Sequence, residues 1–329
     1  MNFFKSLVER ASNDPKVVLL PEVDKDEDGT IREAIRISKE RRTAKTLGIT
    51  SEIINEAKSS GKLEEFVDEY QRLSPNLPRK GAERMLVRDP IAFSLMMVRL
   101  GYADAMVGGR FTKSGNVMAL GKKIVGEEPG KIVSSIYFKE PPEGYALFDL
   151  IAIADMVVNP NPNPDELCKI ILTSAESFET LTGKTPRIAL LSYVTGDPTG
   201  TQLTDPEISK IAETLKKYNE EGHDYVVFQS QLDAAIKPEV AKSKNAPFTD
   251  RPADILVCPH LIASNPMYKC FDTLINGGDS MLYTQGFNHP VMDLSRGDSA
   301  SNIANSIAAA SLAAQGSNRT INDHFLEYL

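Results

Sequence analysis

Residues 285–299 read QGFNHPVMDLSRGDS, and a run of small residues with helical spacing follows them over positions 300–315. Ser295 and Arg296 therefore stand just before a predicted helix. The first N–H groups of a helix have no partner inside it, and an arginine can grip phosphate with two parallel hydrogen bonds. The stretch thus predicts an anion site. An N-cap serine beside a solvated arginine is the alternative that these residues alone leave open.

Composition narrows the class of protein. The chain has 329 residues, 41% of them hydrophobic and 25% charged, and a formal net charge of −8. This length predicts two lobes, each with a core large enough to fold without disulfides. The negative charge argues against nucleic acid as the main partner, although a small anion in a locally positive cleft remains compatible with it. No signal-peptide pattern and no apolar run of about 18 residues occurs, so we expect a cytoplasmic protein without a membrane partner.

The chain shows none of the common metal or nucleotide motifs. Its three cysteines, Cys168, Cys258 and Cys270, are widely spaced, and its four histidines form no HExxH pattern. Neither GxGxxG nor a P-loop is present. We therefore expect no metal site and no tightly bound cofactor.

Strand and helix patterns alternate through both halves, which favours parallel sheets with helices on both faces. One predicted strand, residues 103–109, ends in two glycines and is followed by Arg110, Thr112 and Ser114. The α/β proteins bind ligands at the C-terminal edge of their parallel strands, which is where these hydrogen-bond donors would lie. The helix over 300–315 would be capped by Ser299 or Ser301.

Several motifs occur in one order along the second half of the chain. They are Leu191-Ser192-Tyr193-Val194-Thr195, Gln231-Leu232-Asp233-Ala234-Ala235-Ile236, Tyr268-Lys269, Thr284-Gln285-Gly286 and Asp293-Leu294-Ser295-Arg296-Gly297. Together they resemble the phosphate acetyl/butyryl transferase family, and within it the acetyltransferases most. The resemblance extends to the first half through Val18-Leu19-Leu20-Pro21-Glu22 and Val107-Gly108-Gly109.

This resemblance implies two α/β/α lobes with parallel-rich sheets, similar to the isocitrate and isopropylmalate dehydrogenases, and an active-site cleft between the lobes. The C-terminal helices would complete the first lobe, so that residues 1–140 plus 285–329 form one lobe and residues 141–284 the other. A homodimer is also implied. The implied reaction is acetyl-CoA plus phosphate giving acetyl phosphate and CoA, with CoA as a substrate and without a metal or a covalent acyl-enzyme.

By the family's pattern, Ser295 hydrogen-bonds the reacting carbonyl and Arg296 holds the phosphate. A placed hydroxyl can stabilise the oxyanion that develops when a thiolate attacks an acyl phosphate, so the physical logic agrees. The further residues that we expect to contact substrate or CoA are Arg110, Thr112, Ser114, Ser192, Tyr193, Asn265, Thr284, Gln285, Gly286 and Asn288.

Two departures from the family pattern concern catalysis. The family often has an aspartate seven positions after the serine, proposed as the base for the CoA thiol, and here that position is Asn302. Our hypothesis is that Asn302 orients the thiol while Asp298 or the positive field of the site favours the thiolate, because a thiol is already partly ionised near neutral pH. His289, where the family usually has lysine, is another substitute. A helix-start carboxylate stabilised by the dipole is the alternative for Asp298. The second departure is Ala119, where the acetyltransferases usually place an arginine.

Other readings stay open at this stage. Changes at Leu282-Tyr283, His260 and Ile262 leave propionyl or butyryl transfer as an alternative to acetyl transfer. An NAD(P)-dependent dehydrogenase of similar fold would need an aspartate cluster for its metal, which the sequence lacks. A CoA-binding relative without activity is the third alternative, and the retained Ser295 and Arg296 speak against it.

Overall fold

A computed structural model of the protein describes residues 2–196, 211 and 225–316. The chain forms two compact units, and each is assembled from two segments. Unit 1 comprises Met1–Phe4 and Pro129–Gly286, and unit 2 comprises Lys5–Glu128 and Phe287–Leu329.

The chain passes between the units at residues 4/5, 128/129 and 286/287, whereas the sequence suggested crossings after residues 140 and 284. The reason is β4 (Ser134–Glu140), which is antiparallel to β9 (Asp279–Gln285) along its whole length. A strand paired so completely within one sheet belongs to that sheet's unit. Pro141 and Pro142, which directly follow this strand, therefore lie inside unit 1.

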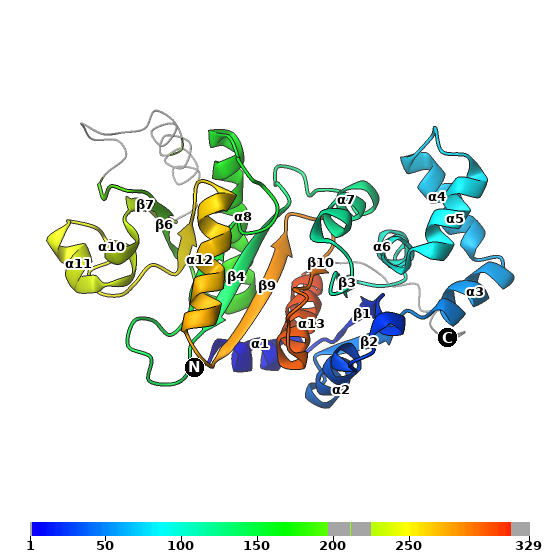
Figure 1. Ribbon diagram of the computed structural model, residues 1–329, viewed down its shortest axis with the longest axis horizontal. Helices are drawn as coiled ribbons and strands as arrows, with labels where there is room; N and C mark the ends of the chain where they lie inside the picture. The colour runs from blue at the N-terminus through cyan, green and yellow to red at the C-terminus, as the bar shows by residue number, and fades with distance from the viewer. Residues whose placement is uncertain (1, 197–210, 212–224, 317–329) are drawn as a thin grey trace. The chain divides into compact units, whose positions relative to one another are not determined.

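Unit 1 is built on a six-stranded sheet in the order β7-β6-β8-β5-β4-β9. Strands β7, β6, β4 and β9 of this sheet are labelled in Figure 1. The first four strands are mutually parallel. Strand β4 is antiparallel to both β5 and β9, so β9 at the edge runs in the same direction as the first four. Besides β4 and β9, its described elements are β5 (Ile151–Ala154), α8 (Pro164–Thr182), β6 (Arg187–Leu191), β7 (Val226–Ser230), α10 (Leu232–Ile236), α11 (Pro238–Ser243), β8 (Ile255–Val257) and α12 (Leu261–Leu274).

Helices α8 and α12 cover opposite faces of this sheet. Adjacent residues of a strand point to opposite faces, and on β4 the ring of Phe138 stacks on Phe178 of α8 with centroids 6.0 Å apart. The neighbouring Tyr137 ring lies 5.3 Å from Tyr268 of α12. The unit is thus a three-layer α/β/α structure. Helix α8 begins at Pro164, which occupies its first turn, and Asn163 caps it.

Unit 2 contains a four-stranded, fully parallel sheet in the order β10-β3-β1-β2. Helix α13 (Ala300–Gln315) packs against this sheet and against α2, and its small residues allow a close approach to the strands. The helix predicted over 300–315 is confirmed, with Ser299 as its cap. The other described elements are α1 (Phe3–Ala11), which begins in unit 1, β1 (Lys16–Leu20), η1 (Val23–Lys25), α2 (Thr30–Arg41), β2 (Ala44–Gly48), α3 (Ser51–Ser59), α4 (Leu63–Leu73), α5 (Arg79–Arg88), α6 (Pro90–Leu100), β3 (Ala105–Gly108), α7 (Ser114–Ile124) and β10 (Val291–Asp293).

The predicted α/β class with parallel-rich sheets is confirmed in both units. In the part of the chain that the structure describes, no helix is both long enough and apolar enough to cross a bilayer.

Candidate functional site

Three loops of unit 2 meet at the C-terminal edge of its parallel sheet. Glu22 follows β1, residues 109–113 follow β3, and residues 294–299 follow β10. Strand β10 pairs in parallel with β3, and Asp293 stands opposite Gly108. The carboxyl ends of neighbouring parallel strands lie at one edge, so these loops are brought together.

Glu22 ties the loop after β3 to the end of β1. Its buried carboxylate accepts hydrogen bonds from the backbone amide of Gly109 at 2.8 Å, from the amide of Phe111 at 3.2 Å and from the hydroxyl of Thr112 at 2.7 Å. The hydroxyl hydrogen of Thr112 is therefore used within the fold. Contact of Thr112 with a substrate stays a prediction.

Arg110 connects the loop after β3 to the loop after β10. Its Nη1 donates to the backbone carbonyl of Asp298 at 2.6 Å, and its Nη2 donates to the Asp28 carboxylate at 2.8 Å and to the Thr30 hydroxyl at 3.3 Å. The amide and hydroxyl of Thr30, and then Arg110, lower the pKa of Asp28 to about 2. Only 8% of Arg110 is exposed. Arg110 thus holds the loop in place, and direct contact with a substrate stays a prediction.

The loop after β10 is closed by its own residues. The Asp298 carboxylate accepts from the backbone amide of Ser295 at 2.7 Å, and the Asp298 amide donates to the Ser295 carbonyl at 3.1 Å. Ser295 and Arg296 are exposed at the tip of this turn. Within the described residues Arg296 makes no ion pair or hydrogen bond. A free guanidinium and a hydroxyl are therefore presented together to solvent.

The first turn of α13 follows this loop directly. The Ser299 side chain accepts from the backbone amide of Asn302 at 3.2 Å and so caps the helix. Asn302 is half-buried on this turn. The helix contributes its positive dipole end to the same place as Arg296. Serine, arginine and helix N-terminus together form a site suited to an anion.

Asp293 is an acidic residue beneath this site that the sequence reasoning did not select. It is 1% exposed, and neither carboxylate oxygen has a hydrogen-bond partner of normal geometry. Burial raises the pKa of Asp293 to about 7, the charges of Glu22 and Asp298 act in the same direction, and the nearby Ser114 hydroxyl opposes them. Ser114 begins α7, so this predicted contact residue lies beside the site. The available signal was an acidic residue at the end of an apolar strand, two positions before Ser295.

Four of the residues predicted to contact substrate lie on either side of the 286/287 boundary between the units. Their positions and contacts show roles within the fold itself. Gln285 is buried in unit 1, and its Nε2 donates to the hydroxyls of Ser134 and Ser174. Thr284 is buried beside it, and Gly286 has a φ of +83° with no room for a Cβ. In unit 2, the Asn288 side chain donates to the backbone carbonyl of Val125 at 3.0 Å. These are structural roles, and substrate contact stays a prediction.

Unit 1 has a pocket of its own at the C-terminal edge of its parallel strands. The cavity of about 490 Å³ is mostly apolar and includes Ser192 and Tyr193 after β6 and Cys258 and His260 after β8. Burial raises the pKa of the Cys258 thiol to about 12, so this thiol is not a nucleophile at neutral pH. Asn265 lies on α12 and donates to the carbonyl of Met156, so its amide is engaged in the fold.

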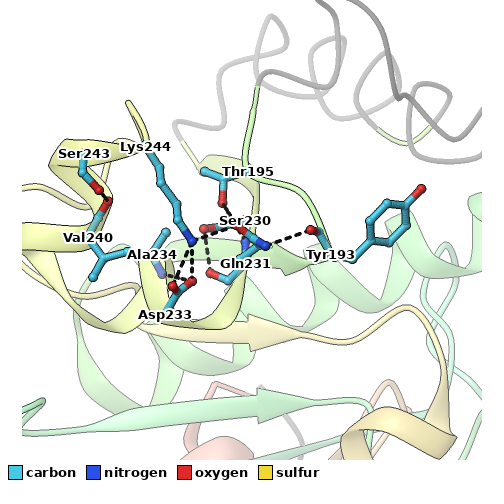
Figure 2. A network of polar contacts seen from close by, with 9 residues as sticks. All are labelled: Tyr193, Thr195, Ser230, Gln231, Asp233, Ala234, Val240, Ser243 and Lys244. Carbon is cyan, nitrogen blue, oxygen red and sulfur yellow. Dashed lines mark hydrogen bonds and ion pairs between the residues drawn. The ribbon is translucent and has the colours of Figure 1, made fainter.

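A network of polar contacts supports the loop that carries Tyr193 (Figure 2). The Gln231 amide side chain donates to the Tyr193 carbonyl at 2.9 Å, and the Gln231 backbone donates to the Thr195 hydroxyl at 3.0 Å. Lys244 donates to Gln231 at 2.8 Å and to Asp233 at 2.8 Å. Figure 2 shows the Tyr193 ring directed away from this network, and 75% of the residue is exposed. The motif 231–236 therefore positions the β6 loop, a role that its sequence did not indicate.

Among the residues that the structure describes, no group of three or more His, Cys, Asp and Glu side chains could hold a metal ion.

Comparison with known proteins gives this geometry a context. A family model described as phosphate acetyl/butaryl transferase matches residues 2–311. The chain belongs to this family. It is 32% identical to the phosphate acetyltransferase of Acetivibrio thermocellus, with 96% of this chain and 99% of that protein covered. Identity to the phosphate acetyltransferase of Thermoanaerobacterium thermosaccharolyticum is 33%, covering 96% and 100%.

Solved structures share the fold. A phosphotransacetylase from Streptococcus pyogenes superimposes with a TM-score of 0.78 at 24% identity, covering 96% of this chain and 98% of that one. The EutD phosphotransacetylase from Staphylococcus aureus gives a TM-score of 0.75 at 24% identity, covering 94% and 99%. The relatives are named phosphate acetyltransferases, and as a member of their family this chain is an acyltransferase.

Proposed function

We propose that the chain is a phosphate acetyltransferase, which moves an acetyl group reversibly between CoA and inorganic phosphate. The observation that carries this proposal is the exposed pair Ser295 and Arg296, held by Asp298 at the N-terminus of α13. Relatives that cover almost the whole chain are named phosphate acetyltransferases, which supports acetyl as the acyl group.

The proposed step is a direct attack in a complex with both substrates. The CoA thiolate sulfur forms a bond to the carbonyl carbon of acetyl phosphate, and the bond from that carbon to the phosphate oxygen breaks. Arg296 and the free N–H groups of α13 hold the phosphate, which leaves with the bonding electron pair. The Ser295 hydroxyl donates to the carbonyl oxygen as negative charge develops on it.

The reaction must also remove the proton of the CoA thiol. A free thiol of pKa about 8.5 is a few per cent ionised at neutral pH, and a positive site raises that fraction. The departing phosphate can take up the proton. Asn302 cannot accept it, and we propose that its side chain orients the thiol.

The apolar pocket of unit 1 supports binding of an uncharged part of CoA. Its lining offers few polar groups besides Ser192 and His260. Pockets of this size with mostly apolar linings are typical small-molecule sites, and the pantetheine arm of CoA is an uncharged group that suits such a lining. The raised pKa of Cys258 in the same wall fits a reaction without a covalent acyl-enzyme.

The test is thiol-dependent formation of acetyl-CoA from acetyl phosphate by the purified full-length chain. Ser295→Ala should lower kcat by roughly 10²–10³-fold, as expected when one oxyanion donor is removed. Ser301→Ala is the matched control, because Ser301 is the second residue of the same helix and does not cap it. Asn302→Asp should raise the rate or shift its pH profile. Absence of turnover with acetyl, propionyl and butyryl phosphate would defeat the proposal.

The assembly and location expected from the resemblance form part of the same proposal. We propose a homodimer in the cytoplasm. Light scattering should then give twice the chain mass of 36.1 kDa. A mass of one chain at micromolar concentration would exclude the dimer.

A further inference from the structure

A basic pocket lies in the helical part of unit 2, built from residues that the proposed catalytic steps do not use. The cavity of about 460 Å³ is bordered by α4, α5 and α7 and by the start of α6. Arg84 and Arg88 from α5 and Lys123 from α7 contribute three positive charges to its wall. A positive cluster of this kind stands out in a chain of net charge −8.

The two arginines lack counter-charges. Within the described residues neither guanidinium has an ion pair or hydrogen bond, and both side chains are exposed. Arg84 and Arg88 stand one turn apart on α5, where like charges repel and weaken a helix. By contrast, the exposed Arg36 of the same unit is paired with Glu33 and Glu40. The repulsion between Arg84 and Arg88 therefore lowers stability, and no ion pair within the described residues offsets it.

The remaining polar groups of the wall do not neutralise this charge. Asp89 is the one carboxylate of the lining, and its Oδ1 accepts from the backbone amides of Ile91 and Ala92 as the cap of α6. Lys123 lies over the Tyr70 ring, with Nζ 4.7 Å from the centroid and 3.2 Å from the hydroxyl oxygen. Neither contact removes a positive charge from the lysine. The wall thus keeps an excess of two positive charges, three cations against one carboxylate.

We propose that this pocket binds a small molecule that carries at least two phosphate charges next to an apolar portion. Arginines bind phosphate oxygens through paired donors, and a lysine adds a point charge. The cavity is larger than a single phosphate needs, and Leu77 and Met85 supply apolar surface for the rest of the ligand. Two sources share this chemistry: the phosphoadenosine end of CoA, and a separate phosphorylated nucleotide that acts as an effector.

The binding test uses adenosine 3′,5′-bisphosphate as the probe in calorimetric titrations of the full-length protein. The double variant Arg84→Ala/Arg88→Ala should bind the probe about 100-fold more weakly, about tenfold for each arginine. Arg84→Lys/Arg88→Lys should recover part of the affinity. Arg36→Ala, which removes one exposed charge elsewhere in unit 2, should leave the affinity unchanged. Because the substitutions relieve a repulsion, the alanine variant should melt no lower than wild type.

Kinetic measurements separate the two sources. If the pocket holds the end of CoA, the double variant raises the KM for CoA about tenfold or more and leaves the KM for CoA lacking the 3′-phosphate nearly unchanged. If it holds a separate effector, the probe binds in the presence of saturating CoA and the KM for CoA does not change. Either result supports the pocket.

Equal affinity of wild type and the double variant for the probe, or no binding to wild type, would overturn the inference. The binding measurement does not require turnover. A protein that is inactive with every acyl phosphate but binds the probe through Arg84 and Arg88 would defeat the proposed function and leave this site standing.

Discussion

The carboxylate of Asp298 and the backbone amide of Ser295 are joined by a hydrogen bond of 2.7 Å, which fixes the turn that presents Ser295 and Arg296. The carboxylate is thus part of the turn's own structure. The sequence alone makes Asp298 a candidate for promoting the thiolate through its charge. The contact supports a positioning role, and the two roles differ in what an amide at this position would do.

Replacement of Asp298 separates the two roles. Asp298→Asn keeps an oxygen that can accept from the Ser295 amide, whereas Asp298→Ala does not. We expect Asp298→Ala to lower kcat/KM for acetyl phosphate by roughly 10–100-fold, because misplacing reacting groups is costly, and Asp298→Asn to stay within about threefold of wild type. Steady-state rates across pH are the measurement, and neither variant should change the shape of the profile. Equal losses in both variants would show that the charge itself is needed.

Arg110 predicts a coupling between stability and activity. Arg110→Ala removes its hydrogen bonds to Asp28, Thr30 and the Asp298 carbonyl. We expect unfolding free energy to fall by roughly 1–3 kcal/mol and kcat to fall as well, since the catalytic turn loses its support. Urea unfolding measures the first quantity. Arg36→Ala, which breaks exposed ion pairs only, should lower the unfolding free energy much less than Arg110→Ala does. An Arg110→Ala protein as stable and active as wild type contradicts this role.

The sequence predicted features that depend on neighbouring residues. The helix over 300–315 follows from local spacing and from a serine cap, and the structure has both. The C-terminal edge of the unit 2 sheet follows from the order of strands and glycines. These predictions depend only on residues that lie close together in the sequence.

Contacts between residues far apart along the chain could not be predicted from the sequence. Arg110 reads as an exposed cation after a strand, but its partners lie 82 and 188 positions away, at Asp28 and Asp298. Glu22 reads as the end of a motif, yet it holds the β3 loop 87 positions on. The burial of Asp293 depends on how β10 sits beside β3. A single sequence carries no record of such pairings, because burial is decided by the packed fold.

Two glycines near the site predict opposite responses to alanine. Gly109 has a φ of +100°, and a Cβ there would lie 2.1 Å from Asp293 Oδ1. Gly115 lies in α7, where a Cβ would meet nothing within 4 Å. We expect Gly109→Ala to lower unfolding free energy by more than about 1 kcal/mol, and Gly115→Ala to raise it by roughly 0.5–1 kcal/mol. Thermal melts of both variants test this pair, and destabilisation by Gly115→Ala would contradict the open geometry.

Asp293 predicts a pH dependence of stability whose sign can be worked out. Its folded pKa of about 7 lies above the ordinary value of about 3.8. The folded state therefore keeps the proton that the unfolded state releases as pH rises from about 4 to 7, and stability falls across that window. Above it, the buried charge beside Glu22 and Asp298 costs on the order of 1–4 kcal/mol.

Asp293→Asn removes that charge while it keeps the size of the side chain. We expect the variant to be more stable than wild type at pH 8, and the difference to shrink steadily as pH is lowered toward 4. Urea unfolding at several pH values between 4 and 8 measures both curves. Glu22→Gln serves as the comparison, because the Glu22 carboxylate accepts three hydrogen bonds from the loop, and its replacement should lower stability at pH 8. A variant Asp293→Asn that is less stable than wild type at pH 8 would mean that the charged carboxylate has partners in solution.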